Sequence, residues 1–583
     1  MFSWMVRKAT SQHIQSSAQH PRRFTTDDTT KMAADADTTK KLDALFQPWN
    51  RSDAPGLIVG VAQHGVPIYR RGFGLASIEH GTANTPQTKM RIGSTSKHFA
   101  ALAVLLLAED GTLDVNAPLR TYLPELTGPA GDPTLRHLMN HTGGLRDPYD
   151  LPGILLCGGF PSMIAAGAGL ELSQRFTSAN YAPGERMVYN NNGYYLLSLV
   201  VERLGGMPFA DFLKQRLLDP LGMGETQLLP SDMTMLPGIA SFHLLQADGS
   251  YRRGIYPSEE LLGSGGMVST LDDMLRWLAH LRGDKKVGSA ESWQQMLERP
   301  RYSSGARGDY CLGLTREQYR GVEIVHHAGA VLGCTTQMLT VPEHALDIII
   351  IFNRMDSNPS AMALKVIDAV LADSALTPVI PPVSAEGRDA IIGRWYSPTS
   401  RRLFGIVSHP VEGQVPMLAL SVHHQVMGLL KPCDGGLLMT TPAHGSVAVR
   451  LPADGDGKPE QLDFTDSGHL ESFTRLPEAG PAAVDLAAEI VGTYHYAELD
   501  REVSVRLEDG VLYLDLHPLY GQSRLQLEPF SAEVCGFKLT GSFPIPVPTF
   551  GSLSIAREQG RVTGLWLSNA RTRNLWLERR TAA

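Results

Sequence analysis

A proline-rich segment, residues 377–382, divides this chain of 583 residues into two parts with different sequence patterns. Before it, strand patterns near residues 56–72 and 321–353 flank a long stretch of helical patterns. After it, short alternating stretches separated by glycine turns predict strands only. We therefore expect an α+β unit, whose sheet pairs its first strands with its last, followed by all-β domains.

The strand-rich part contains two copies of one pattern. Residues 391–396, with the sequence IIGRWY, resemble residues 490–495, with the sequence IVGTYH. Because two copies of this length form a duplicated domain rather than a solenoid, we expect two antiparallel β-barrels or sandwiches in succession. The predicted divisions of the chain are a disordered or targeting extension at 1–38, a first domain at 39–376, and barrels at 385–477 and 486–583.

Composition narrows the class of protein. The formal net charge of -8 gives no basic footprint, so we expect neither nucleic acid nor a membrane surface as a partner. The longest apolar run, Phe99–Ala108, is too short to cross a bilayer. The five cysteines are scattered along the sequence, which argues against both a disulfide framework and a clustered metal site.

The first 26 residues leave two localisations open. They lack the apolar core of a secretory signal, and the scattered cysteines favour a reducing compartment, so we expect the cytoplasm. The same residues contain Arg7, Lys8, Arg22 and Arg23, several serines and threonines, and no acid. That composition makes a mitochondrial transit peptide the alternative.

The sequence Ser94-Thr95-Ser96-Lys97 opens a helical pattern that Gly111 ends. Residues three apart share one face of a helix, so Lys97 is expected beside the Ser94 hydroxyl. A serine is a weak nucleophile until a base takes its proton. Lysine can be that base when burial and the positive end of the helix dipole keep it neutral. On spacing alone, a capped helix start with a solvated lysine explains the same residues.

A second candidate pair, Tyr189 and Asn191, lies between a Pro-Gly-Glu turn and a helical pattern. A tyrosine at the start of a helix can point its hydroxyl into a cleft. The amide two residues later can bind a substrate carbonyl and Lys97 together. A surface turn is the alternative for this pair taken alone.

A third candidate, His327, follows a predicted strand that ends at His326, and Gly329 allows a close backbone approach. We expect His326 to face away from the cleft, because neighbouring residues on a strand alternate sides. His141 is an alternative histidine, but it lies at the end of a predicted helix, and we interpret it as structural.

In this order the motifs resemble those of the serine penicillin-recognising enzymes, the family of class C β-lactamases, DD-peptidases and related esterases and D-aminopeptidases. The family's Ser-x-x-Lys, Tyr-x-Asn and His-x-Gly or Lys-Thr-Gly motifs are matched here by Ser94/Lys97, Tyr189/Asn191 and His327/Gly329. The likeness extends over residues 45–375. It implies an α+β catalytic domain of the serine β-lactamase/DD-peptidase type, followed by two lipocalin-like antiparallel β-barrels.

The resemblance also implies an acyl-enzyme mechanism without metal or cofactor. Ser94 would attack a carbonyl, and Lys97 and Tyr189 would share the proton transfers, with the identity of the base left open. Asn191 would orient the substrate amide. The backbone N–H groups of Ser94 and Ala330 would form the oxyanion hole.

In the third motif, His327 occupies the position at which β-lactamases have a lysine that binds the substrate carboxylate. A mostly neutral histidine binds a carboxylate less firmly than a permanent cation does. The resemblance therefore implies that penicillin hydrolysis is disfavoured, while β-lactams stay candidates as inhibitors.

Within the family the chain is most similar to the D-stereospecific aminopeptidases, in which a loop of the last barrel reaches the cleft and an aspartate receives the substrate ammonium. The matching loop here, Phe537–Phe550, contains no carboxylate. It would instead present a stiff apolar finger to the cleft, or form a barrel turn away from it. A shifted alignment would give the aspartate's role to Asp500 or Glu533.

The leading expectation is a serine hydrolase that removes N-terminal D-amino acids from small peptides, amides or esters. The alternative is a serine carboxylesterase or amidase without D-aminopeptidase specificity, which the acid-free loop favours. A third hypothesis, a silent binding protein, conflicts with the complete set of motifs. A homodimer stays open.

Overall fold

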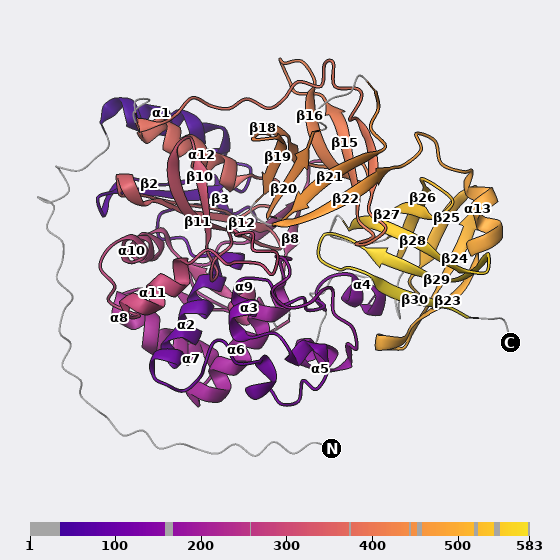
Figure 1. Ribbon diagram of the computed structural model, residues 1–583. Helices are drawn as coiled ribbons and strands as arrows, with labels where there is room; N and C mark the ends of the chain where they lie inside the picture. Colours follow the sequence, from indigo (N-terminus) through magenta and orange to yellow (C-terminus); the bar gives the residue numbers. More distant parts are fainter. Residues whose placement is uncertain are drawn as a thin grey trace, which may run out of the picture.

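The computed structural model describes residues 35–157, 167–256, 258–259, 261–371, 375–441, 445–451, 457–517, 523–541 and 549–580. Figure 1 shows a large part built from helices and a sheet, followed along the chain by two all-β parts. Helix α1 (Ala36–Phe46) begins slightly before the predicted boundary at residue 39, because the Asp35 side chain accepts hydrogen bonds from the backbone N–H groups of Asp37 and Thr38.

The large part contains a six-stranded antiparallel sheet in which the first strands pair with the last, as predicted. Strand β1 lies between β2 and β13, with Val59 opposite Ile350. All residues of β13 are buried, because helices cover both faces of the sheet. The order across the sheet is β10 (Thr315–Tyr319), β11 (Val322–Val331), β12 (Cys334–Val341), β13 (Leu346–Phe352), β1 (Leu57–Gln63) and β2 (Val66–Phe73).

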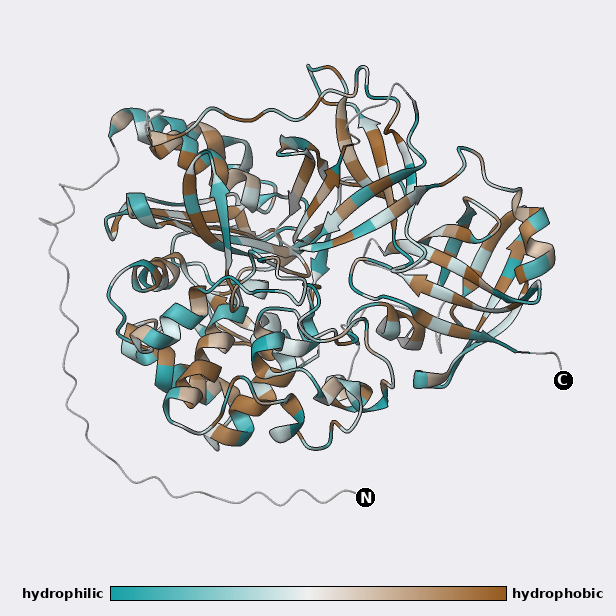
Figure 2. Cartoon of the chain, viewed as in Figure 1, coloured by the Kyte–Doolittle hydropathy of each residue, from teal (hydrophilic) through white to brown (hydrophobic). Residues whose placement is uncertain are grey.

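Two helices cover one face of the sheet and a larger helical region covers the other. Helices α1 and α12 (Pro359–Val370) contact each other on the first face, and α10 (Leu271–Arg282) contacts β1 and β13 on the second. Figure 2 shows apolar stretches along these strands and the helices beneath them. The core on this second side therefore lies between the sheet and the helices that carry the candidate site.

Helix α2 (Lys97–Glu109) is the centre of the helical region, since nearly all its residues are buried. It contacts α6 (Asn191–Gly205), α9 (Leu262–Gly265) and α11 (Ala290–Leu297). The other elements of this part are α3 (Leu135–Met139), α4 (Leu151–Cys157), α5 (Ala168–Arg175), α7 (Phe209–Leu213), α8 (Asp219–Leu221), β3 (Leu75–Ser77), β4 (Thr82–Ala83), β5 (Met90–Arg91), β6 (Gln227–Leu228), β7 (Phe242–Leu245), β8 (Tyr251–Gly254) and β9 (Met267–Ser269).

The first all-β part is one nine-stranded antiparallel sheet, rolled so that β17 and β19 near its two ends contact each other. Its strands are β14 (Gly393–Tyr396), β15 (Leu403–His409), β16 (Met417–Val422), β17 (Gln425–Leu429), β18 (Lys431–Cys433), β19 (Gly436–Thr441), β20 (Gly445–Arg450), β21 (Gln461–Asp466) and β22 (His469–Arg475).

The second all-β part is a closed eight-stranded barrel, and helix α13 (Ala483–Ile490) adds Leu486 and Ile490 to its core. Its strands are β23 (Gly492–Tyr496), β24 (Arg501–Glu508), β25 (Val511–Asp515), β26 (Ser523–Pro529), β27 (Val534–Gly541), β28 (Phe550–Glu558), β29 (Arg561–Ser568) and β30 (Leu575–Arg579). We call these two parts the first and the last barrel.

The two barrels repeat the same local arrangement at the matched sequences. Gly393 and Gly492 begin β14 and β23 with φ angles of 154° and 151°, which favour glycine. In the first barrel, Arg475 donates to backbone carbonyls and lies over the ring of Trp395. In the last barrel, Arg579 does the same over Tyr494. The repeat predicted from sequence is therefore present in the packing of single side chains.

The described helices include none with the length and apolar character needed to cross a lipid bilayer.

Candidate active site

Ser94 lies in a short 3-10 turn, Gly93–Ser96, that leads directly into α2. Its neighbours in this turn are buried, whereas Ser94 itself is partly exposed and therefore open to a substrate. Lys97, the first residue of α2, places its Nζ atom 3.2 Å from Ser94 Oγ. The spacing in the sequence thus becomes a direct contact between hydroxyl and amine.

The Lys97 amine is fully buried and is held by two further acceptors. Nζ lies 2.8 Å from Oδ1 of Asn191 and 2.6 Å from the carbonyl oxygen of Ser264. Burial lowers its pKa well below the ordinary value, and the positive charge of Arg571 lowers it further. A neutral amine donates two protons to these oxygens and turns its lone pair toward the Ser94 hydroxyl. This arrangement fits a base poised to take the Ser94 proton.

Tyr189 comes from the loop that precedes α6, and its ring is buried beside Lys97. Lys97 Nζ lies 4.8 Å from the centre of the Tyr189 ring. Burial raises the pKa of the phenol, and a hydrogen bond with Ser94 offsets part of that rise. The phenol is therefore protonated at neutral pH. It can donate a proton at Ser94 rather than remove one.

His141 supports Tyr189 from behind. The two rings lie 4.2 Å apart, and the His141 Nδ1 atom accepts a hydrogen bond from the backbone N–H of Asn190. The interpretation of His141 as structural agrees with these contacts, although it lies closer to Tyr189 than its place in the sequence suggested.

Asn191 begins α6, and a buried carboxylate fixes its position. The Asn190 side chain caps the helix by accepting from the backbone N–H of Gly193. The backbone N–H of Asn191 donates to Oδ2 of Asp147 over 2.9 Å. Sequence reasoning missed Asp147, because no short motif joins it to Asn191.

His327 lies within β11, which continues to Val331 rather than ending at His326. Its Nδ1 atom lies 2.5 Å from the carbonyl oxygen of Ala328, so Nδ1 donates there and Nε2 accepts from the Tyr310 hydroxyl at 2.8 Å. Burial lowers the pKa of the His327 imidazole to about 3, with a further contribution from Lys97. The ring is therefore neutral at physiological pH. His326 contacts Gln337 and Glu317 instead, as expected for the opposite face of the strand.

Gly329 lets β11 pass directly against the turn that carries Ser94. A Cβ atom at Gly329 would lie 2.0 Å from the carbonyl oxygen of Ile92. One residue further along, the backbone N–H of Ala330 faces Gly93, where a Cβ atom would lie 2.6 Å from that nitrogen. Ala330 is thereby placed next to the turn that carries Ser94, where a backbone donor to an oxyanion would have to lie.

A loop of the last barrel brings Arg571 into this cluster. The loop joins β29 to β30, and the Arg571 guanidinium carbon lies 5.1 Å from the centre of the Tyr189 ring. Nothing in the sequence around Arg571 indicated this placement. The contact links residues almost four hundred positions apart.

The loop predicted to reach the cleft, Phe537–Phe550, is only partly described. Its ends belong to β27 and β28, and residues 542–548 lie outside the described residues. The two alternative acids pair elsewhere, Asp500 with His495 at 2.9 Å and Glu533 with Arg557 at 3.0 Å. Within the described ranges neither acid contacts a residue of the Ser94 cluster.

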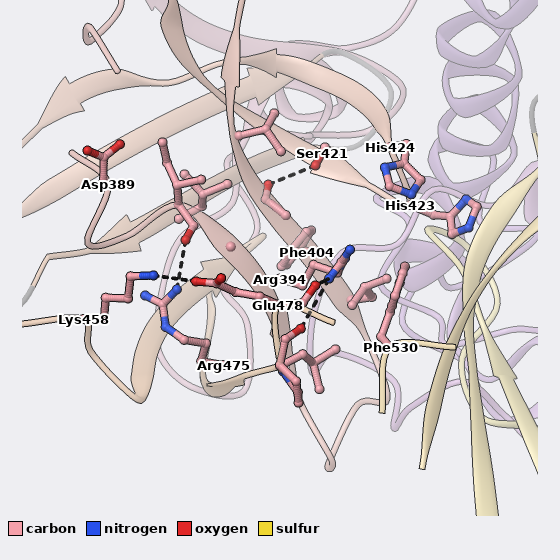
Figure 3. Close-up of a pocket in the computed structure, with 18 residues that line it drawn as sticks. Asp389, Arg394, Phe404, Ser421, His423, His424, Lys458, Arg475, Glu478 and Phe530 are labelled. Atoms are coloured by element: carbon pink, nitrogen blue, oxygen red, sulfur yellow. Dashed lines mark hydrogen bonds and ion pairs between the residues drawn. The ribbon is translucent and has the colours of Figure 1, made fainter. Parts of the chain in front are cut away.

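A separate cavity of about 410 Å³ lies where the two barrels meet, away from Ser94. Figure 3 shows interactions of several charged residues that line it. Lys458 pairs with Glu478, the Arg475 guanidinium donates to backbone carbonyls, and Arg394 lies over Phe530. The candidate mechanism therefore depends on the residues around Ser94 and not on this cavity.

Comparisons with known proteins agree with this geometry. A family model described as Beta-lactamase matches residues 39–372. The chain is 27% identical to a D-aminopeptidase of Cereibacter sphaeroides, over 94% of this chain and 99% of the relative. It is 26% identical to a D-aminopeptidase of Brucella canis, over 88% and 94%. Among solved structures, the octameric penicillin-binding protein homologue from Pyrococcus abyssi shares the fold with a TM-score of 0.50 and 19% identity, covering 75% of this chain and 100% of that one.

Proposed function

Because the chain belongs to the β-lactamase family, we propose that it is a serine hydrolase that cleaves small peptides, amides or esters through an acyl-enzyme on Ser94. The observation that carries this proposal is the buried Lys97 amine. It lies 3.2 Å from Ser94 Oγ, with its two other polar contacts made to carbonyl oxygens.

In the first half of the reaction, Ser94 Oγ attacks the substrate carbonyl carbon while its proton passes to Lys97 Nζ. The oxyanion that forms is stabilised by the backbone N–H groups of Ser94 and Ala330. The bond to the leaving group then breaks, and Tyr189 gives that group its proton and regains one from Lys97. The raised pKa of Tyr189 and the lowered pKa of Lys97 support this division of roles.

In the second half, water attacks the carbonyl carbon of the ester on Ser94 and gives a proton to Lys97. The bond between Ser94 Oγ and the acyl group then breaks, the acid leaves, and Oγ regains a proton from the same groups. Asn191 accepts a hydrogen bond from Lys97 through Oδ1, and the NH2 of the same amide can donate to the substrate carbonyl. Removing one oxyanion donor in such a site typically lowers the rate by about 100-fold or more.

We further propose that the enzyme removes N-terminal D-amino acids. Two observations support this specificity: the D-aminopeptidase relatives match along almost the whole chain, and both barrels that follow the catalytic domain are present. The resemblance of the three motifs points the same way.

A carboxylesterase or amidase activity is the second candidate, and one observation favours it. An ammonium removed from water needs a charged or strongly polar acceptor. Among the described residues around Ser94 the nearby carboxylate is Asp147, whose two oxygens already accept from the backbone N–H groups of Asn191 and Tyr149. The sequence of residues 542–548 adds no acid.

Initial rates on three substrates separate the two candidates: D-alanine p-nitroanilide, L-alanine p-nitroanilide and p-nitrophenyl butyrate. Strong turnover of the D-anilide over the L-anilide establishes a D-aminopeptidase. Cleavage of the ester with neither anilide touched establishes an esterase. The matched control is Ser94→Ala, which we expect to fold and to lose all turnover. Hydrolysis by purified Ser94→Ala would contradict the mechanism.

A further inference from the structure

Arg571 stands out because its side chain has no use in the mechanism above. Its guanidinium forms no hydrogen bond and no ion pair with any residue in the described parts of the chain, and it lies against the face of Tyr189. A guanidinium stacked on a ring keeps the edges of its planar donor fork available.

The loop that carries Arg571 is fixed rather than loosely attached. Asn569 accepts hydrogen bonds from the backbone N–H groups of Arg571 and Thr572, at 2.9 Å and 2.7 Å. The Asn569 amide and the Thr572 hydroxyl both donate to the carboxylate of Asp150, which precedes α4. Asn180 donates to the carbonyl oxygen of Arg571 over 3.0 Å. The backbone that presents the guanidinium is therefore held from both sides, which lowers the entropic cost of binding a ligand there.

The charges around Arg571 leave the site positive. Lys97 and His327 are both driven toward their neutral forms by burial. Asp147 is close enough to interact with Arg571, but burial raises the pKa of its carboxyl, and its oxygens are already hydrogen bonded. A substrate group that enters beside Tyr189 thus meets a cation with no competing acid in contact.

We propose that the Arg571 guanidinium is a carboxylate subsite, so that preferred substrates carry a carboxylate close to the scissile bond. A planar guanidinium binds a carboxylate through two parallel hydrogen bonds, which gives both affinity and orientation. This inference rests on the proposed hydrolase function and specifies its substrate class. The barrel loop then contributes substrate selection that the catalytic domain alone does not contain.

The test uses two pairs of substrates that each differ by one carboxylate. The first pair is D-alanyl-glycine and D-alanyl-glycinamide, with the charge on the leaving-group side. The second is N-succinyl- and N-acetyl-D-alanine p-nitroanilide, with the charge on the acyl side. We expect kcat/KM to favour the carboxylate form by about tenfold or more in at least one pair, since a hydrogen bond to a charged group is worth this much.

The Arg571→Gln variant should bring that ratio close to one, and Arg571→Lys should keep part of it because a charge remains without the planar fork. Arg561→Gln is the matched control, since Arg561 is exposed at the opposite end of β29. It should leave the ratio unchanged. Ratios near one in both pairs for the wild type, or a preference that survives in Arg571→Gln, would overturn the proposal.

A binding measurement separates this inference from the proposed hydrolase function. The same four compounds are titrated calorimetrically into Ser94→Ala and into a Ser94→Ala/Arg571→Gln double variant. If the wild type cleaves neither these compounds nor p-nitrophenyl butyrate, but Ser94→Ala still prefers the carboxylate forms through Arg571, the hydrolase proposal fails and the subsite stands. If cleavage occurs without any charge preference, the subsite fails and the hydrolase stands.

Discussion

Burial sets the charge of the side chains around Ser94. Desolvation is the main cause that lowers the pKa of Lys97 and of the His327 imidazole, and it also raises the pKa of the Tyr189 phenol. Arg571 is the second cause that lowers the pKa of Lys97. At the scale of single residues, the last barrel therefore lowers the pKa of Lys97, the base in the proposed mechanism.

This coupling predicts a shift in the pH profile. Acylation needs neutral Lys97, so kcat/KM should rise with pH through the lowered pKa of Lys97 and then level off. Arg571→Gln removes a neighbouring positive charge and makes the protonated amine less unfavourable. The pKa of Lys97 then rises, and the acid limb moves to higher pH. The measurement is kcat/KM for p-nitrophenyl butyrate against pH, with Arg561→Gln as the control. A limb that stays in place or moves to lower pH would contradict the coupling.

His327 allows a second prediction at this scale. A lysine in its place supplies the ammonium that a β-lactam carboxylate can pair with, so His327→Lys should raise the rate of acylation by a fluorescent penicillin about tenfold or more. His327→Gln can still bond the Tyr310 hydroxyl but adds no charge, and should not raise that rate. Thermal melts of both variants check that they fold. An acylation rate in His327→Lys equal to that of the wild type would refute the role given to His327.

At the scale of elements, local patterns predicted much of the site. The helices predicted after Ser94 and after Tyr189 are both present, because each is specified by residues close in sequence. The pairing of β1 with β13 followed from strand patterns at both ends of the domain. The continuation of β11 through Gly329 was missed, since Ala and Gly are weak strand formers and only pairing with β12 holds this segment extended.

Contacts between distant segments could not be predicted in this way. Asp147 and Arg571 join the site through the fold, and no pattern in their neighbourhoods identifies them. The two barrels also differ in strand number, nine in the first and eight in the last, because the short strand β18 is added at one end of the first sheet.

A substitution at Gly329 tests how tightly β11 packs against the turn that carries Ser94. A methyl group in Gly329→Ala would meet the Ile92 carbonyl oxygen at 2.0 Å, so β11 and the Ser94 turn must separate. We expect a loss of about 1–3 kcal/mol in the free energy of unfolding. We also expect kcat/KM of the folded variant to fall, because Ala330 moves with the strand. Gly224→Ala is the control, since a Cβ atom at Gly224 would meet nothing within 4 Å among the described residues. Equal stability and activity in the two variants would show that the contact is not tight.

At the scale of the whole molecule, the last barrel is attached to the catalytic domain by apolar contacts as well as by the Arg571 loop. Leu151, Ile154 and Leu155 of α4 belong to the same apolar cluster as the core of the last barrel, and Figure 1 shows α4 beside that barrel. Arg146, a buried residue of the catalytic domain, donates to the backbone carbonyls of Arg573 and Asn574. These contacts hold the loop at Tyr189 in one position.

Buried charges connect the three parts near the same place. Asp466 of the first barrel pairs with Arg402 and lies 3.8 Å from Arg573 of the last barrel. Arg186, just before Tyr189, lies 4.0 Å from Glu471 of the first barrel. Because these groups are removed from water, each depends on its partners.

Asp466→Asn should therefore destabilise the whole assembly. It removes the carboxylate that pairs with the buried Arg402 and lies 3.8 Å from the buried Arg573, and breaking a buried pair in this way costs about 3–5 kcal/mol. The midpoint of thermal unfolding should fall clearly, and kcat/KM should fall as the Arg571 loop loosens. The matched control is Asp463→Asn on the same strand, where the pair with Arg450 is more exposed and spans 3.8 Å. If both variants melt at the same temperature, the buried cluster does not hold the parts together.

The most direct test of the account is peptide mapping by mass spectrometry after reaction with a fluorophosphonate probe at neutral pH. We expect one adduct per chain, located on Ser94, that is absent in Ser94→Ala and strongly reduced in Lys97→Met, which keeps an unbranched apolar stem but has no amine. An adduct on another residue, or labelling of Lys97→Met at the wild-type rate, would contradict the claim that a buried neutral Lys97 activates Ser94.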